Sequence, residues 1–199
     1  MTFDLITALF GFALISSITP GPNNLMLLAS GANFGIKRTL PHVLGVTIGH
    51  SFMVVMVGLG LMQVFKTFPI AYTILKAASV AYLLVLAYKI ATNTTPPKAS
   101  ESSTGKPFTF FQAAGFQWVN PKAWTMALTA ISVYAPPSPD KRAILIVAVV
   151  FALTNLPAIT TWVLMGREMS RFLNTPKRLR IFNITAALLL VASLVPILL

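Results

Sequence analysis

The chain alternates between long apolar runs and shorter polar segments. A helix needs about 20 mostly apolar residues to cross the hydrocarbon of a membrane, and six runs come close to this length or exceed it. The pattern therefore predicts an all-α membrane protein of six transmembrane helices. A stretch rich in Pro, Ser, Thr and Lys at 92–107 and a basic stretch at 167–180 are predicted loops. The predicted spans are residues 3–28, 43–63, 68–91, 108–134, 143–165 and 181–199.

A single transmembrane transporter domain, residues 1–199, accounts for the whole pattern. Loop 92–107 joins two halves, about 1–91 and 108–199, and leaves no room for a separate soluble domain. With three spans each, the halves would have opposite orientations in the membrane. Spans one and four are interrupted at corresponding positions, and such pairs are typical of inverted repeats. We therefore expect a 3+3 inverted repeat with helices one and four broken, although two unrelated kinks are the alternative.

The centre of the first run contains Pro20, Gly21 and Pro22, followed by Asn23 and Asn24. Each proline removes a helical hydrogen-bond donor and clashes with the preceding turn. The carbonyl groups that lose a donor cannot face lipid, because an unpaired backbone group in hydrocarbon is too costly. They must face protein, water or a ligand, as in the broken helices of transporter binding sites. The alternative is a kink that shapes packing and contacts no solute.

The interruption of the fourth run places Lys122 directly after Asn120 and Pro121. A buried ammonium group needs an anion or backbone carbonyls, and a substrate carboxylate is such an anion. The half-helices after the two interruptions would add free amides and positive dipole ends, and asparagine amides both donate and accept hydrogen bonds. The predicted substrate-binding residues are Asn23, Asn24, Asn120, Lys122, Asn155 and Lys76, and the predicted helix-break residues are Pro20, Gly21, Pro22 and Pro121.

Three positions in the later spans have a second interpretation. Asn155 lies close to Pro157, and this pair predicts a third break in the fifth span. The stem of Lys76 can snorkel along the third span, so a structural role for this lysine is open. Trp162 is expected in an aromatic belt at the membrane surface.

His50 lies near the middle of the second span, after Gly45 and Gly49, which allow a close approach of neighbouring backbone. It is the candidate for proton coupling, because an unperturbed histidine changes its charge near neutral pH. A hydrogen bond from its ring to a neighbouring carbonyl is an equally weighted alternative. No carboxylate lies inside a predicted span to form a proton relay, since Asp4 is at an edge and the other three acids are in loops.

The composition and charge agree with a membrane protein. Only 10% of the 199 residues are charged and 56% are hydrophobic, whereas soluble domains carry roughly a quarter charged residues. Most of the net charge of +11 lies in the loops, so it is better explained by orientation and lipid headgroups than by nucleic acid. Predicted loops one, three and five hold ten Lys and Arg and loops two and four hold three, which places both termini outside the cytoplasm.

The sequence gives no sign of an enzyme. It has no cysteine, which excludes disulfides and thiol catalysis. No glycine-rich phosphate loop, metal-ligand set or catalytic-triad spacing is found. We expect no cofactor and no metal.

Four segments of the chain form distinctive motifs. They are the Thr-Pro-Gly-Pro-Asn-Asn motif at 19–24, the glycine-spaced second span, Ala-Tyr-Leu at 81–83 with Lys89, and Phe-Gln-Trp-Val-Asn-Pro-Lys at 116–122. Together they resemble the LysE/RhtB family of amino-acid exporters. The resemblance covers essentially the whole chain and implies efflux of amino acids or their derivatives across the bacterial inner membrane, driven by an ion gradient. The Pro-Asn-Asn variant and residues 88–92 are most similar to the cysteine/O-acetylserine exporter branch. Many relatives carry an acidic residue where this chain has His50, so the presumed proton coupling is altered here or works over a different pH range.

We therefore expect a secondary active exporter of small amino acids in the bacterial inner membrane, proton-coupled and working by antiport. Its partners would be the amino acid and membrane lipid, with no nucleic acid, and a homo-oligomer is left open. The alternative is a passive channel or an exporter of another small solute or ion, although the scarcity of membrane carboxylates argues against cation binding. A membrane enzyme or assembly factor would need a nucleophile or metal constellation that the sequence lacks.

Overall fold

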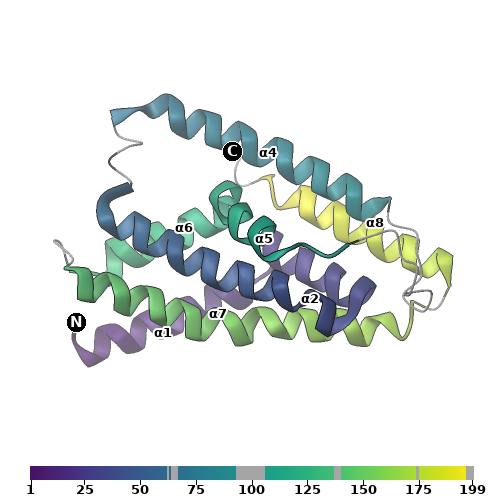
Figure 1. Cartoon of the computed structure of the whole chain (residues 1–199), viewed down its shortest axis with the longest axis horizontal. Coiled ribbons are helices and arrows are strands. Elements are labelled where there is room, and N and C mark those ends of the chain that lie inside the picture. Colours follow the sequence, from purple (N-terminus) through teal and green to yellow (C-terminus); the bar gives the residue numbers. More distant parts are fainter. Residues whose placement is uncertain (62, 64–66, 93–105, 137–139, 174, 196–199) are drawn as a thin grey trace.

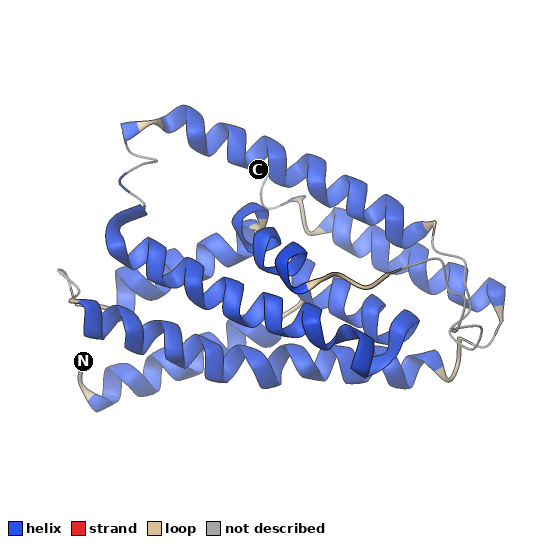
Figure 2. Ribbon diagram, viewed as in Figure 1, coloured by secondary structure: helices blue, strands red, loops and turns tan. Residues whose placement is uncertain are grey.

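The structure is a computed structural model that describes residues 1–61, 63, 67–92, 106–136, 140–173 and 175–195. In this part of the chain the regular elements are helices joined by short loops, without a strand (Figure 2). Most of the predicted loop 92–107 and the last four residues of the predicted sixth span lie outside the described residues. The elements are α1 (Phe3–Ile18), α2 (Pro22–Met56), the π-helical turn η1 (Val57–Leu61), α4 (Pro69–Ala91), α5 (Phe110–Phe116), the 3-10 turn η3 (Gln117–Val119), α6 (Pro121–Thr129), the π-helical turn η4 (Ala130–Tyr134), α7 (Lys141–Ser170) and α8 (Pro176–Ala192).

Two long helices, α2 and α7, form the centre of the molecule and pack along each other (Figure 1). Helix α1 lies against α7, and α4 lies against α8 on the opposite side of the molecule. The short helices α5 and α6 lie between these layers, where α5 packs on α2. Three segments are long and apolar enough to cross a membrane, Pro22–Leu61, Thr73–Ala91 and Lys141–Ser170. The protein is therefore a multi-pass membrane protein.

Small residues bring the backbones of these helices close together. A Cβ atom added to Gly31 of α2 would meet the carbonyl oxygen of Val163, and one added to Gly166 of α7 would meet that of Leu28. Gly45 and Gly49 face α5 in the same way, as the sequence predicted. Lipid tails are as apolar as the side chains of the helices, so close packing rather than a hydrophobic driving force holds such contacts together.

Both predicted interruptions are present. Helix α1 ends at Ile18, and the chain continues through an extended Thr19 (ψ 146°) and an extended Gly21 (φ −179°) before α2 begins at Pro22. In the second half, Asn120 is extended (φ −96°, ψ 107°) between η3 and α6. Each new helix begins with a proline, whose missing N–H costs nothing at the first helical position.

The third break predicted at Asn155 and Pro157 is wrong, because α7 runs without interruption from Lys141 to Ser170. A lone proline removes one hydrogen bond, and its fixed φ is compatible with a helix. The helix therefore continues past Pro157 with the loss of one backbone hydrogen bond.

Two predicted loops are also shorter than expected. The first and second apolar runs are joined at a single non-helical residue, Gly35, whose φ of 74° is accessible to glycine at little cost. The basic stretch at 167–180 is mostly helical, because α7 extends to Ser170 and α8 begins at Pro176. The side chain of Thr175 accepts a hydrogen bond from the N–H of Arg178 and so starts α8 five residues earlier than predicted.

The close contact between α2 and α7 leads to a prediction on stability. Replacing Gly166 or Gly31 by alanine should lower the free energy of unfolding by about 1–3 kcal/mol, because the two backbones must move apart. Unfolding of the purified protein in detergent measures this change. Gly11→Ala is the matched control, since no atom lies within 4 Å of its added Cβ. Equal stability of the Gly166→Ala and Gly11→Ala proteins would contradict the packing described here.

Candidate functional site

The carbonyl groups at the end of α1 are satisfied first by residues of the break itself. The N–H of Thr19 donates to the Ile15 carbonyl (3.1 Å), and its hydroxyl donates to the Ser16 carbonyl (2.9 Å). The Nδ2 of Asn24 donates to two further carbonyls, those of Ser17 (2.8 Å) and Thr19 (2.7 Å). Asn24 is buried on the first turn of α2, so its amide closes the gap between the two half-helices.

Two donors come from distant parts of the chain. The indole N–H of Trp162 on α7 donates to the Ile18 carbonyl (3.1 Å). The Nζ of Lys122 on α6 donates to the carbonyls of Thr19 (2.6 Å) and Pro20 (3.3 Å) and to the Thr19 hydroxyl (2.9 Å). The ammonium group therefore lies at the negative end of the α1 dipole, which favours a positive charge.

A second link joins the two interruptions. The Nδ2 of Asn23 donates to the Oε1 of Gln117 (2.9 Å), and the Nε2 of Gln117 donates back to the Oδ1 of Asn23 (3.2 Å). Gln117 also donates to the Ala113 carbonyl (2.9 Å) and is completely buried. The first turn of α2 and the turn η3, which precedes α6, are thus held side by side by a pair of amides.

The two new helices begin differently. Asn120 caps α6, since its side chain accepts the N–H of Lys122 (3.2 Å). No side chain caps α2, whose N-cap is Gly21. The first turn of α2 therefore keeps its positive dipole end without a neutralising side chain, which suits an anion.

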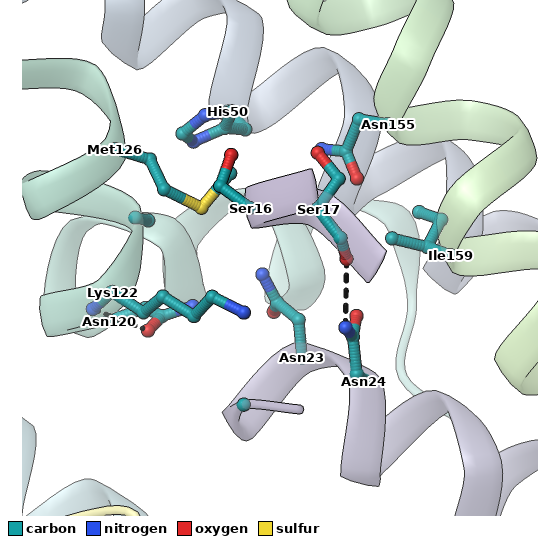
Figure 3. A pocket seen from close by; sticks show the side chains of 12 residues that line it. Ser16, Ser17, Asn23, Asn24, His50, Asn120, Lys122, Met126, Asn155 and Ile159 are labelled. Carbon is teal, nitrogen blue, oxygen red and sulfur yellow. Dashed lines mark hydrogen bonds between the residues drawn. The ribbon is translucent and has the colours of Figure 1, made fainter. Parts of the chain in front are cut away.

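A small polar cavity lies between the two interruptions (Figure 3). Its volume is about 20 Å³, which holds about one water molecule, so no amino acid fits in this conformation. Side chains from α1, α2, α6 and α7 converge on it. The lining residues are Ser16, Ser17, Gly21, Asn23, Asn24, His50, Asn120, Lys122, Ala123, Met126, Asn155 and Ile159.

Two buried polar atoms of this cavity lack a partner in the described part of the chain. The Oγ of Ser17 and the Nε2 of His50 have no hydrogen bond, and the His50 ring is 2% exposed and packs edge-on against Phe151. The side chain of Asn155, which is 4% exposed, lines the same cavity. Buried polar groups are nearly always paired, so Ser17 and His50 indicate a place for water or a ligand.

A larger cavity of about 460 Å³ adjoins the small one. The two share Gly21 and Lys122 in their linings, so these residues separate them. Lys76 and Ser79 of α4 line the larger cavity, whose volume is in the range of small-molecule sites. Its other lining residues are Pro20, Pro22, Leu75, Pro121, Trp124, Thr125, Leu128 and Ser193.

The structure brings most of the residues singled out in the sequence into one place. The members of the small cavity are Asn23, Asn24, His50, Asn120, Lys122 and Asn155. Lys76 lines only the larger cavity.

Some important residues were not among the candidates. Gln117 lies in the Phe-Gln-Trp-Val-Asn-Pro-Lys motif at 116–122, and an amide three residues before the Asn-Pro interruption of an apolar span is a usable signal. Trp162, which the sequence suggested for an aromatic belt, donates its indole N–H to the Ile18 carbonyl at the end of α1. His42 is buried, with both ring nitrogens unpartnered among the described residues, and its ring contacts Phe108.

The bond from Trp162 leads to a prediction. Trp162→Phe keeps an aromatic ring but leaves the Ile18 carbonyl without a donor, so it should lower the free energy of unfolding by about 1–2 kcal/mol. Trp118→Phe is the control, since the indole N–H of Trp118 makes no hydrogen bond to a described residue while its ring packs on Trp124. Unfolding of both variants in the same detergent gives the difference. A smaller loss for Trp162→Phe than for Trp118→Phe would show that this bond contributes nothing.

Comparison with known proteins agrees with this architecture. The family model described as LysE type translocator matches residues 14–194. The cysteine/O-acetylserine efflux protein of Escherichia coli (strain K12) is 31% identical over 195 residues, and that of Salmonella typhimurium is 33% identical over 196 residues; each alignment covers 96% of both chains. No solved structure matches the chain. With a family model that matches almost its whole length, the chain belongs to the LysE type translocator family.

Proposed function

We propose that this protein exports small amino acids or their derivatives across the bacterial inner membrane as a secondary active transporter. The observation that carries the proposal is the meeting of two broken helices at a buried polar cavity that contains an ammonium group and an uncapped helix N-terminus. Relatives named as cysteine/O-acetylserine efflux proteins over 96% of their length support a substrate of this size and chemistry. Cysteine and O-acetylserine are therefore the first substrates to test.

The zwitterion would bind where the two interruptions meet. Its carboxylate would bind to the first turn of α2 and the ammonium group of Lys122, and its other polar atoms would bind to the amide of Asn155, which lines the small cavity. Asn23, Asn24 and Asn120 already form hydrogen bonds within the protein. They would therefore contribute to binding by exchanging these bonds for bonds to the substrate, while Lys76 would contact it in the larger cavity.

The half-helices on either side of each break also suggest how the chain is arranged in the membrane. We propose six spans in one domain, with α1 and the part of α2 before Gly35 forming the first, and α5 to η4 forming the fourth. The halves 1–91 and 108–199 would be inverted repeats, since each has its break near the middle of its first span. The excess of Lys and Arg in predicted loops one, three and five supports both termini outside the cytoplasm.

Proton antiport is the proposed driving force, with His50 as the proton site. Its ring faces the small cavity, and its unpartnered Nε2 is free to exchange a proton with water there (Figure 3). No carboxylate lines either cavity, so a histidine is the side chain best suited to carry a proton beside the substrate.

Transport by inverted membrane vesicles tests the proposed substrate. Vesicles that contain the protein should take up labelled L-cysteine or O-acetylserine and exchange it for unlabelled substrate. Lys122→Ala should reduce the rate about tenfold or more at equal expression, because the carboxylate loses a charge-assisted bond. Lys141→Ala is the control, since Lys141 is exposed at the start of α7. Flux without exchange of label would indicate a passive channel instead, and unchanged export by Lys122→Ala would remove this lysine from the mechanism.

The role of His50 has its own test. In proteoliposomes, an imposed pH gradient should drive accumulation by the wild-type protein, whereas His50→Ala should retain exchange of labelled for unlabelled substrate and lose most of the gradient-driven component. The ratio of the two activities at a fixed amount of protein is the measurement, and it corrects for a partly inactive preparation. A His50→Ala protein with the wild-type response to the gradient would rule out His50 as the proton site.

A further inference from the structure

The ammonium group of Lys122 occupies a complete set of three oxygen acceptors. It contacts the Thr19 carbonyl at 2.6 Å, the Thr19 hydroxyl at 2.9 Å and the Pro20 carbonyl at 3.3 Å. A primary ammonium has three N–H donors and no acceptor, so these three oxygens match all of its donors. The same set would match any other primary ammonium group equally well.

These oxygens attract a cation without a carboxylate. The described acids lie elsewhere: Asp4 is in the first turn of α1, Asp140 caps α7, and Glu168 pairs with Arg171 (2.9 Å). The attraction comes from backbone and hydroxyl dipoles at the C-terminal end of α1. Unwound carbonyls of this kind coordinate cations in transporters with broken helices.

Lys122 reaches the oxygens only by lying across Gly21. A Cβ atom at residue 21 would meet the Cδ of Lys122 at 2.7 Å and its Nζ at 3.2 Å. This crossing also forms the partition between the small polar cavity and the cavity of about 460 Å³. If the side chain left the oxygens, the two cavities would become continuous and an amino acid would have room beside the break.

We infer that the carbonyls of Thr19 and Pro20 and the Thr19 hydroxyl form the subsite for the α-ammonium group of the substrate. This inference rests on the proposed function and specifies how the site recognises both charged groups of a zwitterion. When no substrate is bound, the ammonium group of Lys122 binds to the oxygens of this subsite. The substrate ammonium displaces it, and the displaced Lys122 then pairs with the substrate carboxylate.

The exchange leaves no charge unpaired inside the membrane. One ammonium remains on the oxygens, and the other forms an ion pair with the carboxylate. A ligand with only an amine would release Lys122 without an anion to pair with, and a ligand with only a carboxylate would draw Lys122 away and leave the oxygens bare. Both outcomes are costly in a low-dielectric site. The subsite and Lys122 together therefore favour the binding of α-amino acids over that of simple amines and acids.

Three probes separate these cases: L-cysteine, cysteamine, which lacks the carboxylate, and 3-mercaptopropionate, which lacks the amine. Their affinities for the full-length purified protein are measured under reducing conditions from the rise in melting temperature with ligand concentration. The wild-type protein should bind L-cysteine most tightly. In Lys122→Met the oxygens have lost their occupant, so cysteamine should bind about tenfold more tightly than to wild type and 3-mercaptopropionate about tenfold more weakly, the change typical of one charge-assisted hydrogen bond.

Gly21→Ala provides a second variant that keeps the charge. Residue 21 is extended, a conformation that alanine also adopts, and the added Cβ pushes Lys122 away from the oxygens. Cysteamine should again gain affinity, whereas 3-mercaptopropionate should not lose it, because the ammonium of Lys122 is still present. Lys141→Met is the control for a lost positive charge and should behave as wild type.

The outcomes distinguish the subsite from the proposed function. If L-cysteine binds and is transported while the ratio of cysteamine to 3-mercaptopropionate affinity is the same in wild type, Lys122→Met and Gly21→Ala, the subsite is overturned and the exporter stands. Equal weakening of all three probes in Lys122→Met would also overturn it, since that pattern means a structural role for Lys122. A wild-type protein that binds none of the three probes would overturn the subsite and the proposed function together.

Discussion

The pairing of backbone carbonyls at the end of α1 is the constraint on which this structure depends. Two prolines and an extended glycine stop the helix in the middle of an apolar run, where an unpaired carbonyl costs several kcal/mol. Side chains from three parts of the chain donate hydrogen bonds to these carbonyls. They are Thr19 and Asn24 at the break, Trp162 on α7 and Lys122 on α6. The break is therefore the point to which α2, α6 and α7 are tied.

The same atoms serve stability and recognition. Asn23, Asn24 and Lys122 hold the half-helices together and also line the cavity, so a bound solute must exchange hydrogen bonds with them. Such exchange costs less than opening a dry interface, because every group keeps a partner throughout. It also explains why a cavity of about 20 Å³ can belong to a transporter: the space is closed by side chains that a substrate can replace, next to a cavity of about 460 Å³.

The prolines of this chain show that composition and local context decide between a break and a continuous helix. Pro41 and Pro157 lie inside α2 and α7, which continue through them. Pro20 and Pro22 flank a glycine, and Pro121 follows an asparagine that caps the next helix. A lone proline inside a helix removes one bond and permits helical φ, whereas the Pro-Gly-Pro cluster removes adjacent donors and the Asn-Pro pair supplies an N-cap and a new helix start. This difference accounts for the wrong prediction of a third break.

The sequence by itself determined the class of protein, the position of both breaks and most of the cavity-lining residues, because prolines and amides in an apolar run have few stable arrangements in a membrane. It did not determine which donor meets which carbonyl. The pairing of Asn23 with Gln117, the bond from Trp162 to Ile18 and the position of Lys122 across Gly21 join residues about a hundred or more positions apart. Only the packing of η3, α6 and α7 against the broken helix brings these groups within hydrogen-bonding distance. No local sequence pattern encodes that proximity.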